Sequence, residues 1–143
     1  MAATIQLEVV TPERLVVQEE VDDITMPGKS GYLGILPGHA PLITEIAVGE
    51  ITYHSSGQTR RLSVAWGFAE VLPDRVSVLA ETAEFAEEID LARAQAALKR
   101  AQERIAQGGE NLDWDRATLA LARALLRIQV VSKHQGVNIA SAR

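Results

Sequence analysis

The hydrophobic period of this chain changes within residues 75–105, which read RVSVLAETAEFAEEIDLARAQAALKRAQERI. Residues 75–80 are a short β-rich run that is typical of a strand. From Glu87 onward the period is helical, because apolar residues recur at alternating steps of three and four: Leu91, Ala94, Leu98, Ala101 and Ile105. The pattern therefore predicts two parts, residues 1–86 and residues 87–143.

The part before this change is predicted to be a series of short strands. Ile5, Leu7 and Val9 alternate with polar neighbours, and turn residues such as Pro73-Asp74 separate the later runs. Those runs are residues 15–17, 21–26, 42–48, 51–54, 60–66, 68–72 and 75–80. Many short strands with no helix among them are typical of an antiparallel sandwich or barrel.

The part after this change is predicted to be two helices. Gly108 and Gly109 end the first helix, Asn111 is the predicted N-cap of the second, and Gly136 is its predicted end. Apolar residues recur at steps of three and four in the second helix as well. A short glycine loop between two such helices predicts an antiparallel hairpin.

The two predicted helices also resemble each other in sequence. At a shift of 23 residues, an aspartate, three arginines and an alanine recur: Asp90 with Asp113, Arg93 with Arg116, Ala94 with Ala117, Arg100 with Arg123, and Arg104 with Arg127. Two helices with one heptad pattern align their apolar positions in any case, so the arginines are the informative matches. Duplication and coincidence both stay open as explanations.

Composition and charge exclude several classes of function. The 143 residues are 47% hydrophobic and 23% charged, as in a globular protein, and they include no cysteine for a disulfide, a thiolate zinc site or a nucleophile. Residues 1–86 carry a net charge of −7 and residues 87–143 one of +2. Because phosphate binding needs a basic face, the acidic first part argues against nucleic acid as a partner.

Membrane insertion and metal binding are not expected either. The longest apolar stretch, residues 119–131, is interrupted by two arginines and is too short to cross a bilayer. His39, His54 and His134 are far apart in the sequence, so they offer no local spacing of metal ligands. The first residues do not read as a charged-then-apolar leader, and we expect a soluble chain.

Two motifs resemble parts of known catalytic or phosphate-binding sites but lack residues that those sites need. Gly28-Lys29-Ser30 resembles the end of a phosphate-binding P-loop, but Asp23 stands where that motif needs a glycine, and the glycines and prolines that follow prevent the necessary helix. His39 lies in a rigid Pro-Gly loop, and the sequence has no Gly-x-Ser-x-Gly segment. We therefore expect no catalytic residues, and we interpret the loop as a docking surface.

The arginines of the helical part allow two interpretations. Arg93 and Arg100 share one face of the first helix, and Arg123 and Arg127 share a face of the second. They are either solvated cations on an alanine-rich surface or two stripes that converge on a polyanion, for which the planar guanidinium is well suited. Spacing alone favours the first interpretation.

Residues 26–44, MPGKSGYLGILPGHAPLIT, resemble the signature of the ATP synthase epsilon subunit family. The likeness covers essentially the whole chain, including the start of the hairpin at Ile89-Asp90-Leu91-Ala92-Arg93-Ala94. The resemblance implies an N-terminal antiparallel β-sandwich of two sheets followed by a C-terminal antiparallel two-helix hairpin. It also implies a non-catalytic rotor subunit of the F-type ATP synthase, peripheral at the cytoplasmic face of a bacterial cell membrane.

The same resemblance implies partners for each part. The sandwich is expected to bind the gamma subunit and to face the ring of c subunits with a surface that includes Lys29, Tyr32, Pro37, Gly38 and His39. The hairpin is expected to be permissive when it is folded. When it extends into the alpha/beta catalytic head, it is expected to restrain ATP hydrolysis.

Some bacterial family members bind ATP on the folded hairpin, and the resemblance extends to their nucleotide-binding residues. The matching residues here are Glu84, Asp90, Arg93, Arg100, Arg123 and Arg127. The two carboxylates would accept hydrogen bonds from the adenine amino group, and the later arginines would neutralise the phosphates. ATP is then a regulatory ligand, and no cofactor or metal is required. The alternative function is a free-standing nucleotide-sensing module outside any synthase.

Overall fold

The alternation predicted for the first strand is present in the structure. A computed structural model describes the backbone of residues 3–141 and the side chains of residues 3–135. In β1 (Ile5–Val10), Ile5, Leu7 and Val9 are fully buried, and the residues between them are partly exposed. Because successive side chains of a strand point to opposite faces, one face of β1 contributes to the core and the other lies outside.

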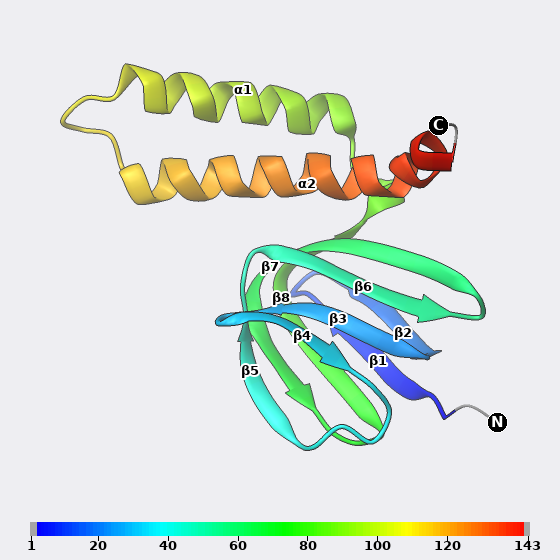
Figure 1. Cartoon of the computed structure of the whole chain (residues 1–143). Coiled ribbons are helices and arrows are strands. Elements are labelled where there is room, and N and C mark those ends of the chain that lie inside the picture. Colours follow the sequence, from blue (N-terminus) through cyan, green and yellow to red (C-terminus); the bar gives the residue numbers. More distant parts are fainter. Residues whose placement is uncertain (1–2, 142–143) are drawn as a thin grey trace. The chain divides into compact units, whose positions relative to one another are not determined.

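Seven further strands complete a β-sandwich. They are β2 (Leu15–Val21), β3 (Asp23–Gly28), β4 (Gly31–Ile35), β5 (Leu42–Ile46), β6 (Gly49–Ser55), β7 (Gln58–Val71) and β8 (Arg75–Phe85). The strand order is β2-β1-β8-β7-β5-β3-β4, and β6 pairs with β3 and β7. Figure 1 shows the two layers, and the predicted sandwich is confirmed. One pair, β1 with β8, is parallel, whereas the other pairs are antiparallel as predicted.

Strand β7 belongs to both layers. Its first half pairs with β6 and its second half with β5, and the chain changes partner at Trp66 and Gly67, whose φ angles are 44° and 148°. A Cβ atom at Gly67 would lie 1.8 Å from the backbone oxygen of Leu79, so only glycine fits there. The sequence predicted two separate runs, residues 60–66 and 68–72, where the structure has one bent strand.

Several strand ends are shifted, for example in β2, which ends at Val21 and not at residue 17, and the larger differences concern β4 and β8. The sequence did not predict β4, because Gly31 and Gly34 lower its strand propensity. A tight turn nevertheless pairs it with β3, from Gly28 opposite Gly31 to Ile24 opposite Ile35. Strand β8 extends to Phe85 and not only to residue 80, because it continues to pair with β7 up to that point.

The chain divides into two compact units, Met1–Phe85 and Ala86–Arg143. The second unit consists of η1 (Ala86–Glu88), α1 (Leu91–Gln107) and α2 (Trp114–Ser141), and Figure 1 shows α1 and α2 as an antiparallel pair. Each helix buries two alanines of its predicted apolar stripe: Ala94, Ala101, Ala117 and Ala124. Within the described residues, no helix is both long and apolar enough to span a membrane.

The ends of α1 follow local capping rules. The helix begins at Leu91 and not at Glu87, because residues 86–88 form a 3₁₀ turn and Asp90 is the N-cap. Its predicted end is confirmed, since Gly108 has a φ of 59° and its backbone N–H donates to the oxygen of Arg104 at 3.2 Å.

Both predicted ends of α2 were wrong. Asp113 and not Asn111 precedes the helix as its cap, because the Asp113 side chain accepts a hydrogen bond from the backbone N–H of Arg116. The helix also continues past Gly136 to Ser141, since one glycine lowers helix propensity without ending a long helix.

Candidate functional site

The predicted ring-facing residues fall into two groups at opposite ends of β4. Lys29 and Tyr32 lie at its start, where Lys29 Nζ is 3.1 Å from Glu45 Oε2. The Tyr32 hydroxyl accepts a hydrogen bond from the backbone N–H of Glu50 at 3.0 Å, and 59% of the tyrosine is exposed. The hydroxyl of Tyr32 is therefore held in place while its ring stays accessible, and Lys29 is an exposed cation beside Glu45.

The second group, Pro37, Gly38 and His39, lies in the loop after β4. Gly38 has a φ of 87°, and its backbone N–H donates to the oxygen of Pro73 at 2.7 Å. His39 Nδ1 is 2.7 Å from the backbone oxygen of Ala40, and because a carbonyl only accepts, this contact requires the Nδ1–H form. The loop therefore has a fixed backbone that is attached to the β7–β8 turn.

An exposed apolar row crosses the outer face of the sandwich. Phe68 on β7 is opposite Leu79 on β8, Leu79 is opposite Val10 on β1, and Val10 is opposite Leu15 on β2. Three of them are more than half exposed, namely Phe68 (56%), Leu79 (60%) and Leu15 (51%), and Ile43 on β5 is 72% exposed. We call Val10, Leu15, Phe68 and Leu79 the apolar row.

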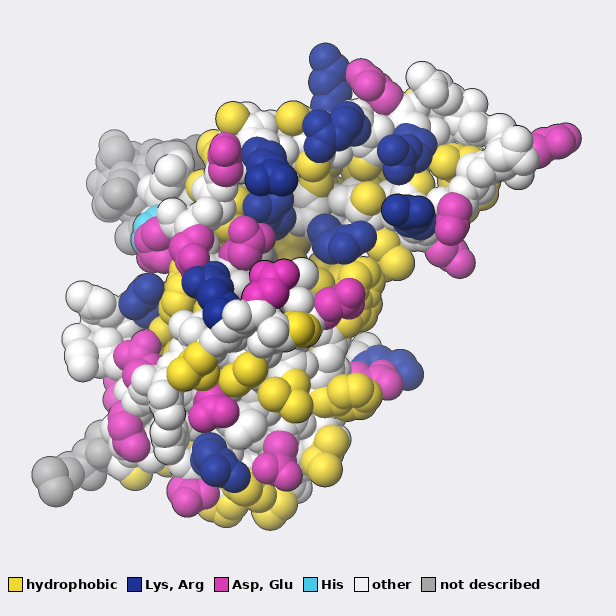
Figure 2. All heavy atoms as spheres, turned by 180° about the vertical axis from the view of Figure 1, so that it is seen from behind, with side chains coloured by type: hydrophobic (Ala, Val, Ile, Leu, Met, Phe, Trp, Pro, Cys, Tyr) yellow, Lys and Arg dark blue, Asp and Glu magenta, His cyan; other side chains and the backbone are white. Residues whose placement is uncertain are grey.

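The sequence analysis did not identify the apolar row, although strand parity contains the signal. Val78 and Ala80 are core residues, so the residue between them must point outward. The same argument applies to Phe68, which precedes the buried Ala69. Figure 2 shows hydrophobic side chains gathered on the sandwich, interspersed with acidic ones.

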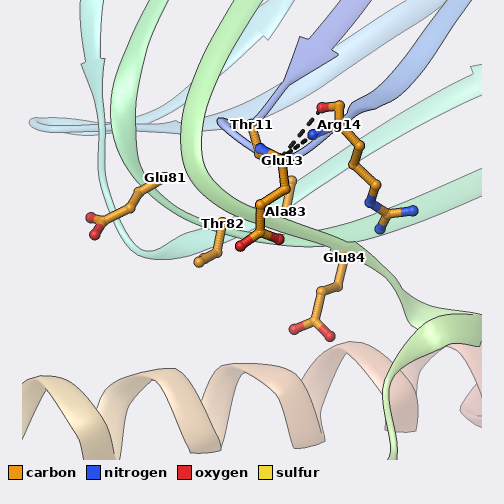
Figure 3. A pocket seen from close by; sticks show the side chains of 7 residues that line it. All are labelled: Thr11, Glu13, Arg14, Glu81, Thr82, Ala83 and Glu84. Carbon is orange, nitrogen blue, oxygen red and sulfur yellow. Dashed lines mark hydrogen bonds between the residues drawn. The ribbon is translucent and has the colours of Figure 1, made fainter.

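Glu84 lines a hollow of about 270 Å³ beside the apolar row (Figure 3). The other lining residues are Thr11, Glu13, Arg14, Glu81, Thr82 and Ala83. The Thr11 hydroxyl organises one wall, because it accepts a hydrogen bond from the backbone N–H of Arg14 at 3.2 Å. With three glutamates and one arginine around it, the hollow has a net negative charge, which suits a cationic group better than a phosphate.

The other five predicted nucleotide-binding residues belong to the helical unit, whereas Glu84 belongs to the sandwich. Arg93 and Arg100 on α1 are exposed, and Arg123 and Arg127 on α2 are half-buried. Figure 2 shows basic side chains gathered over the helices. The fifth residue, Asp90, holds the start of α1, since its Oδ1 accepts from the backbone N–H of Arg93 at 3.1 Å.

The described residues include no cluster of three or more histidine, aspartate or glutamate side chains that could hold a metal ion. The chemistry that they offer is of two kinds. The sandwich exposes apolar and acidic side chains, and the hairpin has guanidinium groups that can bind an anion.

Comparisons with known proteins agree with this description. The family model of the ATP synthase delta/epsilon chain β-sandwich domain matches residues 4–86, and that of the long α-helix domain matches residues 87–132. An ATP synthase epsilon chain of Koribacter versatilis is 60% identical over 109 residues, 76% of this chain and 77% of that protein. An epsilon chain of Geobacter sulfurreducens is 47% identical over 134 residues, 93% of this chain and 97% of that protein.

The fold also recurs in solved structures. A chain in the Euglena gracilis mitochondrial ATP synthase structure, which contains OSCP, F1 and the c-ring, superposes with a TM-score of 0.69 at 22% identity. That match covers 94% of this chain and 81% of the other. A chain in the central stalk and c-ring of the Tetrahymena thermophila enzyme gives a TM-score of 0.53 at 11% identity, with 91% and 95% covered.

Proposed function

Because the chain belongs to the ATP synthase delta/epsilon family, it is a non-catalytic subunit of the central stalk, and we propose that each of its two units has a separate task there. The sandwich binds the gamma subunit and the c-ring, and so couples ring rotation to the stalk. The helical hairpin restrains ATP hydrolysis when it reaches the alpha/beta catalytic head. The subunit is then peripheral, at the cytoplasmic face of the membrane.

The apolar row is the observation that carries the proposal for the sandwich. Single exposed apolar side chains are common on proteins, but a contiguous row across four paired strands is typical of a surface that a partner covers. The row lies beside the acidic hollow around Glu84. We assign the row to gamma, and we expect gamma to present apolar side chains to it and a basic side chain to the hollow.

The two groups around β4 are assigned to the c-ring. Tyr32 exposes an aromatic ring whose hydroxyl is already bonded, and Leu36, 63% exposed, begins the loop that Gly38 connects to Pro73. Fixed loops with exposed apolar side chains lose little conformational entropy on docking. This surface is therefore suited to a lasting contact with the ring.

The hairpin arginines carry the proposal that ATP is a regulatory ligand. Arg123 and Arg127 are one helical turn apart on α2, and their half-burial restricts the positions that their guanidinium groups can take. Arg93 and Arg100 supply further positive charge from α1. A triphosphate held by both helices would favour the folded hairpin over the extended one.

Co-purification tests the stalk assignment directly. A tagged full-length chain, expressed with the gamma subunit of the same organism or of a close relative, should retain gamma through a wash in high salt, because apolar contacts are not screened. A free-standing nucleotide sensor would not retain gamma under any condition. An unrelated tagged protein of the same net charge serves as the control for non-specific capture.

A further inference from the structure

The apolar burial of the helical unit is concentrated at one end of the hairpin. One buried cluster joins the residues before α1 to the C-terminal half of α2, and its members are Ala86, Ile89, Ala94, Val130 and Val131. Elsewhere in the described part of this unit, the buried residues are all alanines: Ala101, Ala117 and Ala124. Larger side chains along the seam between the helices, such as Leu98 and Leu121, are only half-buried. The large buried side chains therefore lie at the base of the hairpin, opposite the Gly108–Gly109 loop (Figure 1).

At this base, α2 is buried on two sides. Val130 and Val131 are neighbours in a helix, so their side chains point about 100° apart, yet their exposed fractions are only 0% and 5%. A single packed helix covers mainly one of two such directions. The cluster accordingly contains Ala86 and Ile89 from the residues before α1, as well as Ala94 from α1 itself. We call residues 86–89 the link.

The link belongs to the core of the hairpin. Phe85, the last residue of β8, packs against the sandwich core, and the guanidinium carbon of Arg60 lies 4.3 Å from the centroid of its ring. The next residue, Ala86, is already part of the hairpin cluster. Beside it, Glu87 Oε1 lies 3.7 Å from Nε2 of His134 on α2. The link is therefore tied to α2 by an apolar and a polar contact, and it is not a loose connection.

We propose that the link and α2 form a clasp, made of Ala86, Ile89, Val130 and Val131, which sets how often the hairpin opens. The alanine seam contributes less, because a buried methyl group removes much less apolar area from water than a buried valine or isoleucine side chain. Separation of α2 from α1 and the link would expose the clasp to water, so its burial favours the folded hairpin. The clasp contains none of the predicted nucleotide-binding residues, and it acts without ATP.

Thiol labelling measures opening directly, because the chain has no cysteine of its own. A single thiol is introduced at the base by Ala94→Cys or in the seam by Ala117→Cys, at positions that are 0% and 1% exposed. A small thiol reagent reaches these positions only when the hairpin opens, and when closing is faster than labelling the rate is proportional to the open fraction. The full-length chain is labelled without nucleotide, each rate is divided by the rate in denaturant, and circular dichroism confirms that each variant is folded.

The clasp predicts a specific pattern of rates. Val130→Ala and Ile89→Ala should each raise labelling at residue 94 by about tenfold, because two or more carbon atoms lose their burial. The matched control Gln129→Ala changes the neighbouring, exposed residue of α2 and should alter the rate by less than about threefold. The double variant of Val130 and Ile89 should open less than the product of the two single effects, because both side chains belong to one cluster. With the clasp intact, residue 94 should be labelled more slowly than residue 117.

Two results would overturn the clasp. One is an equal effect of Val130→Ala and Gln129→Ala on labelling at residue 94. The other is faster labelling at residue 94 than at residue 117 in the chain with an intact clasp, which would make the base the weakest part of the hairpin.

The consequence for ATP hydrolysis rests on the proposed function of the hairpin, and it is measured separately. Enzyme rebuilt with Val130→Ala should hydrolyse ATP more slowly than enzyme rebuilt with the unmodified chain, because the open hairpin is the form that restrains hydrolysis. If labelling at residue 94 rises while hydrolysis stays the same, the proposed restraint fails and the clasp stands.

Discussion

Phe68 and Leu79 face each other across β7 and β8, and each exposes more than half of its surface, 56% and 60%. Their strands are in the middle of the paired series, so both side chains project from the interior of the sheet face and not from an edge. A directly opposed apolar pair in such a position can be covered by one protruding side chain of a partner. The pair is therefore the expected centre of the gamma interface.

The first prediction follows from that position. Phe68→Glu or Leu79→Glu should weaken binding to gamma by at least about 2 kcal/mol, because a central apolar contact is lost and a charge is buried without a partner. Thr59→Glu, an exposed position in the β6–β7 hairpin, is the control for added charge and should bind normally. Binding is measured by titrating each full-length variant into purified gamma, and a normal affinity for both Phe68→Glu and Leu79→Glu would remove the apolar row from the interface.

Alternation along a strand and steps of three and four along a helix depend only on neighbouring residues, so these local patterns predicted most of the fold. The alternation of Ile5, Leu7 and Val9 and the helical spacing from Leu91 onward both match the observed burial. Strand β4 was missed because two of its five residues are glycine, so pairing with β3 and not propensity forms the strand. Where apolar residues pair across strands, as in the apolar row, position depends on register, which a single sequence does not specify.

The site residues also divide into those that a local pattern indicates and those whose role depends on the three-dimensional structure. The arginines of the hairpin stood out by type and spacing, but only the family resemblance made them candidate nucleotide ligands. The hydrogen bond at the start of α1, from the backbone N–H of Arg93 to Asp90, depends on the position of the first helical turn. Asn111 was predicted as the cap of α2 because it also has a good capping side chain, and only the position of the first helical turn selects Asp113 instead. Boundaries decided by competing caps are hard to predict from a sequence.

The second prediction concerns the bend in β7. Gly67→Ala should destabilise the sandwich by at least about 3 kcal/mol, because the new Cβ would collide with the backbone of Leu79 and the backbone angle at Gly67 favours glycine. Gly57 also has a positive φ, but the space around it is open. Gly57→Ala should therefore lower the free energy of unfolding by only about 1–2 kcal/mol. Urea unfolding followed by Trp66 fluorescence, in a Trp114→Phe background, reports the sandwich alone. If the two variants lost the same free energy of unfolding, β7 would be able to straighten and so relieve the collision at residue 67.

The third prediction concerns the ring-facing loop. Gly38→Val should weaken assembly with the c-ring, because a β-branched side chain at a φ of 87° would force the loop away from its bond to Pro73. Gly57→Val is a close match, with a φ of 76° and equally open surroundings, but it lies in the β6–β7 turn. Both variants should lose similar stability, and only Gly38→Val should lose proton-coupled synthesis in rebuilt enzyme. Full synthesis with Gly38→Val would show that the loop conformation is not needed.

The fourth prediction concerns the division into units. A chain that ends after Glu88 should fold, bind gamma and support synthesis, because every residue of the sandwich core precedes residue 86. It should no longer restrain ATP hydrolysis, since α1 and α2 are absent. Steady-state ATPase activity of enzyme rebuilt with the shortened chain provides the measurement, and full-length chain is the reference. If enzyme with the shortened chain hydrolysed ATP no faster than enzyme with the full-length chain, the hairpin would not be the inhibitory element.

The last prediction treats ATP as a conformational ligand. If Arg100, Arg123 and Arg127 bind one phosphate chain, they can do so only while the two helices are antiparallel, so ATP should bind the folded hairpin better than the extended one. At a free concentration tenfold above its dissociation constant, ATP would stabilise the folded hairpin by about 1.4 kcal/mol. Arg123→Ala should weaken ATP binding by roughly 10- to 150-fold, because one charge-assisted contact contributes about 1.5–3 kcal/mol.

Two further variants make that measurement specific. Arg123→Lys keeps the charge but loses the planar fork, so it should recover only part of the affinity. Arg104→Ala removes an exposed arginine near the end of α1 that is outside the predicted set, and it should bind ATP almost normally. Calorimetric titration of the isolated full-length chain gives each affinity, and circular dichroism checks that the helices remain. If Arg104→Ala and Arg123→Ala weaken binding equally, the arginines act as a diffuse cationic surface and not as a phosphate site.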